Sequence, residues 1–161
     1  MKTFLTIPQK VHHGMLIVTD LAVKYAIGRS MSLEEISRKE GISQGFLEEI
    51  AARLRSGGLI KGRRGAGGGY VLTRDPAKLT VAEVITAIEG PLALVECLGE
   101  DNTCALTASC ANRDICGRIQ KRISGLLAEM TVAEAAGISK KSDGVTKKQS
   151  GGVRRERIIR L

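Results

Sequence analysis

In the first half of the chain, two short helical patterns are followed at once by a basic, glycine-tipped pair of strand-like runs, an order that few folds accommodate. Residues 32–40 predict a short helix, which Gly41 breaks. Residues 43–56 predict a second helix, capped by its serine. Residues 59–64 and 69–74 then read as two strands of a hairpin around a glycine-rich turn. A helix-turn-helix that adjoins such a hairpin is a winged helix-turn-helix.

Further helices are predicted on both sides of this unit. Four positions carry a hydroxyl residue followed three places later by Glu or Gln, the pattern of a capping box: Thr6/Gln9, Ser32/Glu35, Thr80/Glu83 and Thr131/Glu134. After Thr6, the first helix is expected to have Pro8 in its first turn and to run to about Ile27, where Gly28 ends it. Its expected apolar stripe contains Val11, Met15, Val18, Ala22 and Tyr25.

The second half of the chain predicts an irregular segment and then one long helix. Residues 90–110 carry no clear periodicity and hold three of the four cysteines. From about Ala111 a helix is expected to reach Glu129, with a coiled-coil-like seam of Cys116, Ile119, Ile123, Leu126 and Met130.

The predicted fold class is therefore mainly α with a small β-hairpin: a winged helix-turn-helix plus a long C-terminal dimerisation helix. Residues 1–90 form the expected DNA-binding domain and 91–110 a cysteine loop. Residues 111–136 hold the dimerisation helix and a short terminal helix. Residues 137–161 are rich in Gly, Ser and Lys, and we expect a disordered basic tail.

The net charge of +8 resides mostly in that tail. Residues 137–161 contain eight Lys and Arg against two acidic residues, which leaves only +2 for residues 1–136. The total charge is thus weak evidence about the folded part. Aromatic residues are scarce, and the chain has no Trp. Proteins that bind single strands or RNA usually stack bases on aromatic rings, so the composition favours duplex DNA.

The second helix of the pair is the one that can lie in the major groove. Ser43, Gln44, Glu48 and Arg55 would then lie near base edges or phosphates. Plain helical packing is the alternative for any helix pair, but the adjoining hairpin favours DNA binding. Glu48 can accept a hydrogen bond from cytosine N4, or it can form a solvated surface pair with Glu49; the sequence leaves both open.

The hairpin carries Arg63 and Arg64 just before a loop made almost entirely of glycine. Such a loop lets the backbone approach DNA closely, and an arginine there can enter the narrow minor groove. A phosphate-cradling nucleotide loop is rejected because no Lys-Ser/Thr follows the glycines and the next residues are strand-like.

Cys97, Cys104 and Cys110 are separated by six and five residues within one loop. The N-terminus has no signal-peptide pattern, so we expect a cytoplasmic protein whose cysteines stay reduced. No C-x-x-C pair is present, which disfavours a zinc ribbon, and three thiolates in one loop suit an iron–sulfur cluster. Thiols without any ligand role are the alternative.

The sequence leaves the fourth ligand open among Cys116, His12 and His13. Cys116 falls on the apolar seam, where packing is expected. Each histidine can equally be an ordinary surface or half-buried residue. 

Three segments together strongly resemble the Rrf2 family of winged-helix transcription regulators, which includes iron–sulfur and nitric-oxide sensors. They are GISQGFLEEIAARLRSGGLIKGRRGAGGGYVLTRD, LTVAEVITAIEGP and the C-x6-C-x5-C loop, and the resemblance covers about residues 7–136. It implies a homodimer whose long helices cross, with each cysteine loop near the partner's DNA-binding unit. It also implies site residues. The recognition surface would contain Ser43, Phe46, Glu48 and Arg55, and the wing residue would be Arg64. The cysteine ligands of the cluster would be Cys97, Cys104 and Cys110.

Two positions depart from the family pattern. Arg113 stands where the iron–sulfur assembly regulators of the family have a histidine, and arginine cannot ligate iron. His12 stands where the nitric-oxide sensors have a carboxylate on the first helix of the partner. We therefore hypothesise that His12 completes a 2Fe-2S or 4Fe-4S cluster in the other protomer.

The sequence thus predicts a homodimeric, non-enzymatic regulator that binds a pseudo-palindromic site on double-stranded DNA and does not contact a membrane. Its alternatives are a regulator that uses zinc or thiol oxidation instead of a cluster and, less favoured, a protein-binding adaptor. A thiol-dependent enzyme is disfavoured because no convincing Cys-His pair is present.

Overall fold

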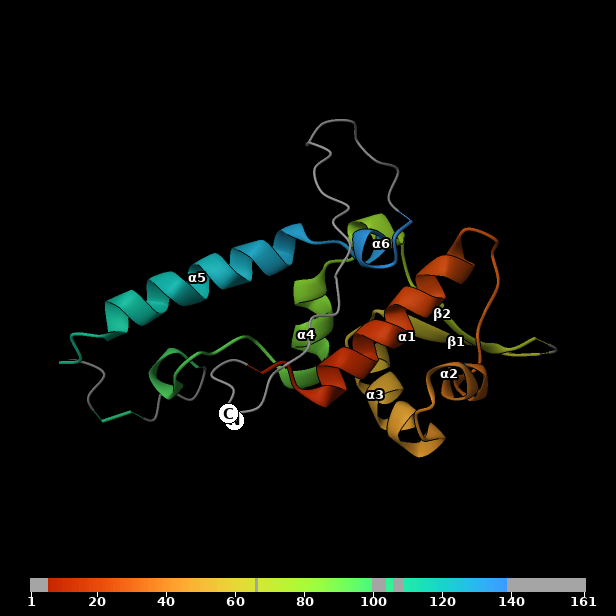
Figure 1. The fold of residues 1–161 in the computed structure, drawn as a ribbon, viewed down its shortest axis with the longest axis horizontal. Helices are drawn as coiled ribbons and strands as arrows, with labels where there is room; N and C mark the ends of the chain where they lie inside the picture. Colours follow the sequence, from red (N-terminus) through yellow and green to blue (C-terminus); the bar gives the residue numbers. More distant parts are fainter. Residues whose placement is uncertain (1–5, 66, 100–103, 106–108, 139–161) are drawn as a thin grey trace, which may run out of the picture.

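The computed structural model describes residues 6–65, 67–99, 104–105 and 109–138 (Figure 1). In chain order its elements are α1 (Gln9–Tyr25), α2 (Leu33–Glu40), α3 (Gln44–Ser56), β1 (Ile60–Arg63), β2 (Gly69–Leu72), η1 (Pro76–Lys78), α4 (Val81–Glu89), η2 (Glu96–Leu98), α5 (Arg113–Glu129) and α6 (Val132–Ala135). The described part is mainly helical, with one two-stranded antiparallel sheet. The predicted fold class and the helix, helix, hairpin order are confirmed.

Helix α1 crosses the middle of the domain and contacts α3, α4, α6 and β2 (Figure 1). Because it has neighbours on several sides, its buried surface is broader than the predicted stripe. Ile17 and Leu21, which the prediction omitted, are fully buried, whereas Tyr25 is 42% exposed.

The predicted start of α1 was wrong. The helix begins at Gln9 with Pro8 as N-cap, and Thr6 plays no capping role, because Pro8 has an extended backbone that keeps the preceding residues out of the helix. The helix also ends at Tyr25, two residues before the predicted end. Asp20 is buried although it is a charged residue, and its Oδ1 accepts a hydrogen bond from Lys39 of α2.

The hairpin runs from the pair Ile60–Leu72 to the pair Arg63–Gly69. An isolated β-bridge joins it to Met31, just before α2: Met31 N–H donates to the Tyr70 carbonyl at 3.1 Å, and Tyr70 N–H donates to the Met31 carbonyl at 2.8 Å. Gly69 has a φ of 144°, and a Cβ placed there would lie 2.5 Å from the Met31 carbonyl oxygen. Only glycine allows this approach of β2 to Met31.

Helices α4 and α6 begin side by side. Thr80 and Thr131 each form a complete capping box, as predicted, and the two threonines face each other in an antiparallel bridge. We call this pair of helix starts the Thr80–Thr131 joint. Two backbone hydrogen bonds hold it, from Val81 N–H to the Met130 carbonyl at 2.9 Å and from Val132 N–H to the Leu79 carbonyl at 2.7 Å.

The carboxylate of Glu83 stabilises the joint from the α4 side. Partial burial raises the pKa of this carboxyl, but the hydrogen bonds from the Thr80 backbone N–H, from Arg74 and from the Thr80 hydroxyl together outweigh burial, so its pKa lies below the ordinary value of 4.5. The ionised form is therefore favoured in the folded protein.

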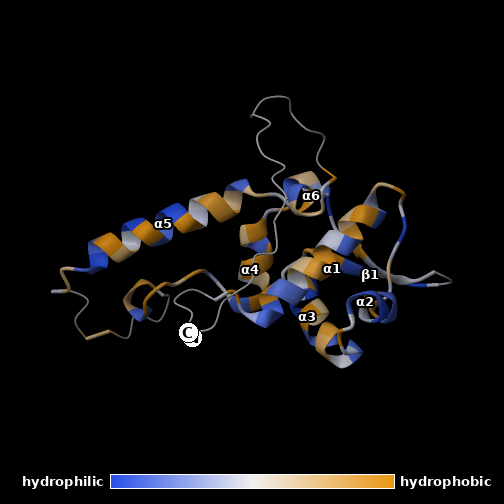
Figure 2. Cartoon of the chain, viewed as in Figure 1, coloured by the Kyte–Doolittle hydropathy of each residue, from blue (hydrophilic) through white to orange (hydrophobic). Residues whose placement is uncertain are grey.

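Helix α5 extends away from the winged helix and contacts α4 and η2 (Figure 1). None of its residues is buried, and the predicted seam is open, with Ile119 45% and Leu126 59% exposed. Figure 2 shows the apolar positions that recur along it. Since the main contacts of α5 among the described elements are with α4 and η2, and none of its residues is fully buried, its apolar side is available for another surface.

The predicted disorder of the basic tail was wrong for its first two residues. Gly137 takes a left-handed φ of 68° and Ile138 N–H donates to the Ala133 carbonyl at 3.0 Å, so both close the end of α6. Residues 139–161 lie outside the described part. Within the described ranges, no helix has the length and apolar content that a bilayer span requires.

Candidate DNA-binding surface and cysteine loop

The exposed edge of α3 contains most of the predicted recognition residues. Ser43, Gln44, Glu48 and Arg55 are all exposed on it. Gln44 Nε2 donates to Glu48 Oε1 at 2.9 Å, one helical turn away, so a polar pair lies near the start of this edge. Phe46 is different: its ring is half-buried and packs against the core, which leaves only part of it for contact outside the domain.

The two neighbouring carboxylates of α3 have different surroundings. Glu49 turns toward α1, where Lys10 Nζ lies 2.6 Å from its Oε1, and Arg53 lies 3.7 Å from the same oxygen. The hydrogen bond from Lys10 and its positive charge lower the pKa of the Glu49 carboxyl. Glu48 has only the neutral Gln44 amide as a side-chain partner among the described residues. Glu48 and Glu49 therefore do not form one surface pair, and Glu48 is the carboxylate that remains on the exposed edge.

The two wing arginines also differ. Arg63 Nη1 donates to the Gly28 carbonyl at 2.9 Å, and Ser30 Oγ donates to the Gly67 carbonyl, so the connection between α1 and α2 holds the wing in place. Arg64 is exposed and has no hydrogen bond or ion pair to any residue that the structure describes. Of the two, Arg64 is the guanidinium available for an external partner.

The first turns of α1 contact α3 directly. The ring of His13 meets the edge of Phe46 at right angles, with 5.3 Å between ring centres. Its Nδ1 is buried without a hydrogen-bond partner in the described part of the chain. His12, by contrast, is exposed. His13 is half-buried, so the imidazole of His12 is the more accessible of the two to a group from outside the domain.

The three loop cysteines lie between η2 and the start of α5. Cys97 is buried in η2, and Cys104 and Cys110 are half-buried. The segment before η2 is tied to α5, because Leu94 N–H donates to the Gln120 side-chain oxygen at 3.0 Å. Residues 100–103 and 106–108 lie outside the described part, and the residues on either side of them do not bring three or more His, Cys, Asp or Glu side chains together.

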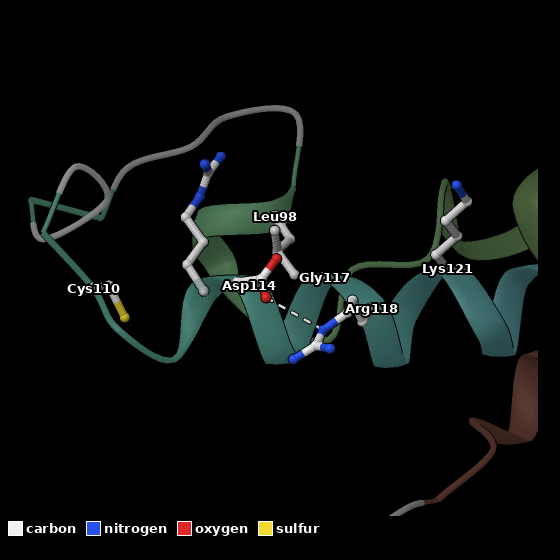
Figure 3. A pocket seen from close by; sticks show the side chains of 7 residues that line it. Leu98, Cys110, Asp114, Gly117, Arg118 and Lys121 are labelled. Atoms are coloured by element: carbon white, nitrogen blue, oxygen red, sulfur yellow. Dashed lines mark ion pairs between the residues drawn. The ribbon is translucent and has the colours of Figure 1, made fainter.

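A hollow beside the first turns of α5 adjoins this loop (Figure 3). Its lining consists of Leu98, Cys110, Arg113, Asp114, Gly117, Arg118 and Lys121. Asp114 forms an ion pair with Arg118 at 3.3 Å, so Arg113 and Lys121 supply its unbalanced positive charge. Cys116, the other candidate ligand, is half-buried on α5.

Sequence reasoning missed two residues that hold α3 in place. Arg53 donates to the Ile88 carbonyl of α4 at 2.8 Å, and Lys10 binds Glu49 across 39 residues of sequence. The spacing of Glu49 and Arg53, one helical turn apart, was a readable signal for their ion pair. The Lys10 contact had no local signal, because it depends on how α1 crosses α3.

Comparison with known proteins gives a consistent result. Residues 7–137 match the Rrf2 family, described as iron-dependent transcriptional regulators. The chain is 34% identical over 125 residues to the regulator IscR of Serratia proteamaculans, covering 78% of this chain and 75% of that protein. Among solved structures it is similar to CymR, the global cysteine regulator of Bacillus subtilis, with a TM-score of 0.69 and 32% identity over 85% of this chain and all of that one. It is also similar to T. potens IscR, with a TM-score of 0.67 and 28% identity over 89% and 95% of the two chains. 

Proposed function

The chain belongs to the Rrf2 family of DNA-binding transcriptional regulators, and we propose that it acts as a homodimer that reads a pseudo-palindromic duplex site under the control of an iron–sulfur cluster. The observation that carries the DNA-binding part is the exposed edge of α3 beside a wing whose Arg64 has no partner among the described residues. A helix of this kind fits the major groove, and an arginine on a glycine loop fits the minor groove.

Base reading is assigned to the start of α3. Ser43, Gln44 and Glu48 present hydroxyl, amide and carboxylate groups there, and Arg55, three turns further along, is suited to a phosphate. In the free protein Gln44 donates to Glu48, so DNA must exchange that bond for bonds to bases. Two α3 helices spaced by one turn of DNA require a dimer, and the open apolar side of α5 supports one.

The side chains of the cysteine loop are of the types that ligate iron–sulfur clusters. Cys97, Cys104 and Cys110 would supply three thiolates, and the exposed imidazole of His12 from the other protomer would supply the fourth ligand. A bound cluster supplies a link between these side chains that oxygen, nitric oxide or iron shortage can remove.

The contacts of α1 explain how such a link would reach the recognition helix. Lys10 and His13 flank His12 in sequence, and they contact Glu49 and Phe46 of α3. If His12 held such a group, the first turn of α1 would be fixed, and the contacts of Lys10 and His13 would then restrain the position of α3. The DNA affinity changes by the difference in free energy between the restrained and the released arrangement.

The test uses the full chain purified without oxygen. We expect a coloured protein with iron and sulfide bound, visible in absorption and electron paramagnetic resonance spectra, that enriches an inverted-repeat sequence from a random duplex pool. His12→Ala is expected to change the spectra and the sensitivity to oxygen, whereas Gln9→Ala, an exposed change one turn earlier on α1, leaves both unchanged. An unchanged spectrum and oxygen response in His12→Ala would remove His12 from the site, and failure to enrich any sequence would refute the DNA-reading proposal.

A second candidate is a regulator whose cysteines act as thiols or bind zinc, without a cluster. Its support is the similarity to CymR, a cysteine regulator, which is comparable in identity to the similarity to IscR. Colourless protein that holds zinc, or that holds no metal and loses DNA binding on mild oxidation, would establish this candidate in place of the cluster.

A further inference from the structure

The C-terminal end of α4 has a contact with the recognition helix that the DNA-binding proposal does not use. Arg53 of α3 donates through Nη1 to the Ile88 carbonyl at 2.8 Å. Because α4 ends at Glu89, this carbonyl has no N–H of its own helix to accept from. The last turn of α4 also contains no basic residue. Arg53 therefore supplies the positive charge that stabilises the C-terminal end of a helix.

The same end of α4 packs closely against both α1 and α3 (Figure 1). A Cβ at Gly57, directly after α3, would lie 2.6 Å from the Cβ of Ala87, and a Cβ at Gly14 of α1 would overlap the Cδ1 of Ile88. Such packing fixes how far apart the helices lie. Apolar contacts have no direction, however, so they do not fix how far one helix slides along another. The directional hydrogen bond from Arg53 fixes that position for α3 and α4.

Segment 90–97 connects this end of α4 with the cysteine loop. Pro91 and Leu92 line a hollow together with residues of α4 and α5. Leu94 N–H donates to the Gln120 side-chain oxygen of α5 at 3.0 Å. Cys97, three residues later, is buried in η2. A change in the loop or in α5 therefore has a short covalent path to the end of α4.

We propose that Arg53 is a positioning residue, which passes a displacement of segment 90–97 to the recognition helix of the same protomer. The inference rests on the proposed function and adds a route that needs no ligand from the partner. The guanidinium suits this role because it binds the Ile88 carbonyl and also lies 3.7 Å from Glu49 of its own helix. With Arg53 present, α3 follows the end of α4. Without it, α4 moves and α3 does not follow.

The test combines two substitutions, alone and together, in the full chain purified without oxygen. Gln120→Ala frees segment 90–97 from α5, and Arg53→Met removes the bond to α4 but keeps an apolar stem of similar length. Arg53→Lys keeps a positively charged donor. Arg38→Ala, an exposed arginine that pairs with Glu34 of its own helix, is the matched control. Deuterium exchange of the α3 amides is measured by mass spectrometry, and binding to an enriched duplex by fluorescence anisotropy.

Gln120→Ala should change the exchange rates of α3 and the DNA affinity of the otherwise wild-type chain by about threefold or more. In the Arg53→Met background the same substitution should change both by less than about 1.5-fold, whereas Arg53→Lys and Arg38→Ala should retain the full response. A residue that only stabilises α3 would leave the response to Gln120→Ala unchanged.

Equal responses with and without Arg53 would therefore overturn the proposal. So would the absence of any α3 response in the otherwise wild-type chain, or a response lost in Arg53→Lys as in Arg53→Met. Wild-type protein that enriches no DNA sequence is a separate result, because it refutes the proposed function while the exchange rates still decide whether Arg53 couples the two parts of the domain.

Discussion

Replacing Gly69 with alanine is expected to separate β2 from Met31 and so displace the wing. The new Cβ would lie 2.5 and 2.6 Å from the carbonyl oxygen and carbon of Met31 and 2.8 Å from the amide nitrogen of Ser32. All three are backbone atoms, so no side-chain rotation relieves the contact. Strand β2 must move away, and the two hydrogen bonds between Met31 and Tyr70 are lost.

The cost follows from these contacts. Each lost backbone hydrogen bond removes about 0.5–1.5 kcal/mol. A side chain at the positive φ of 144° adds about 1–2 kcal/mol. The free energy of unfolding should therefore fall by about 2–5 kcal/mol, measured from urea unfolding followed by circular dichroism. DNA affinity should fall as well, because the displaced wing carries Arg64.

Gly62→Ala is the matched control on the opposite strand. Gly62 pairs with Tyr70, its φ is not positive, and a Cβ there meets nothing within 4 Å. Its stability should stay within about 0.5 kcal/mol of the wild type. If Gly69→Ala unfolds at the same urea concentration as Gly62→Ala, the close approach of β2 to Met31 does not exist as described.

Three further outcomes are expected. Arg64→Ala should weaken DNA binding by about 1–3 kcal/mol without a change in the free energy of unfolding. Arg63→Ala should also lower that free energy by about 1 kcal/mol, because its hydrogen bond to Gly28 is lost. Equal stability of the two variants would contradict the assignment of Arg63 to the domain and of Arg64 to DNA. Because the pKa of Glu83 is lower in the folded protein, the ionised carboxylate contributes stability at pH values above its ordinary pKa of 4.5. That contribution is lost as the pH falls through the lower pKa of the folded protein. Glu83→Gln should therefore flatten the loss of stability over roughly pH 5 to 3, measured in urea titrations. In the proposed dimer, Leu126→Asp should separate the two protomers in sedimentation experiments without loss of helix content. The same oligomeric state in wild type and variant would exclude the open side of α5 as the interface.

The hairpin and the recognition helix could be predicted because their signals are local. The glycine run separates two strand-like patterns, and the register that follows pairs Ile60 with Leu72. The capping boxes at Thr80 and Thr131 were readable for the same reason, since each depends on residues three apart.

The incorrect predictions concern residues whose burial and partners depend on contacts with distant parts of the sequence. Asp20 reads as a polar surface residue, but α2 covers it and supplies Lys39 as its partner. Thr6 and Gln9 have the residue types of a capping box, yet the N-cap of α1 is Pro8, two residues after Thr6. Apart from the half-buried Phe46, the predicted site residues of α3 and the wing are exposed. The division of roles between Arg63 and Arg64, or between Glu48 and Glu49, depends on neighbours that only the fold brings close.

The Thr80–Thr131 joint has a consequence for how a dimer would signal. Its paired backbone hydrogen bonds attach the C-terminal end of α5 directly to the start of α4. In the proposed dimer, a small change in the angle at which two α5 helices cross would therefore move both wings and both α3 helices. Half-site spacing would thus be set at the crossing point, far from the DNA itself.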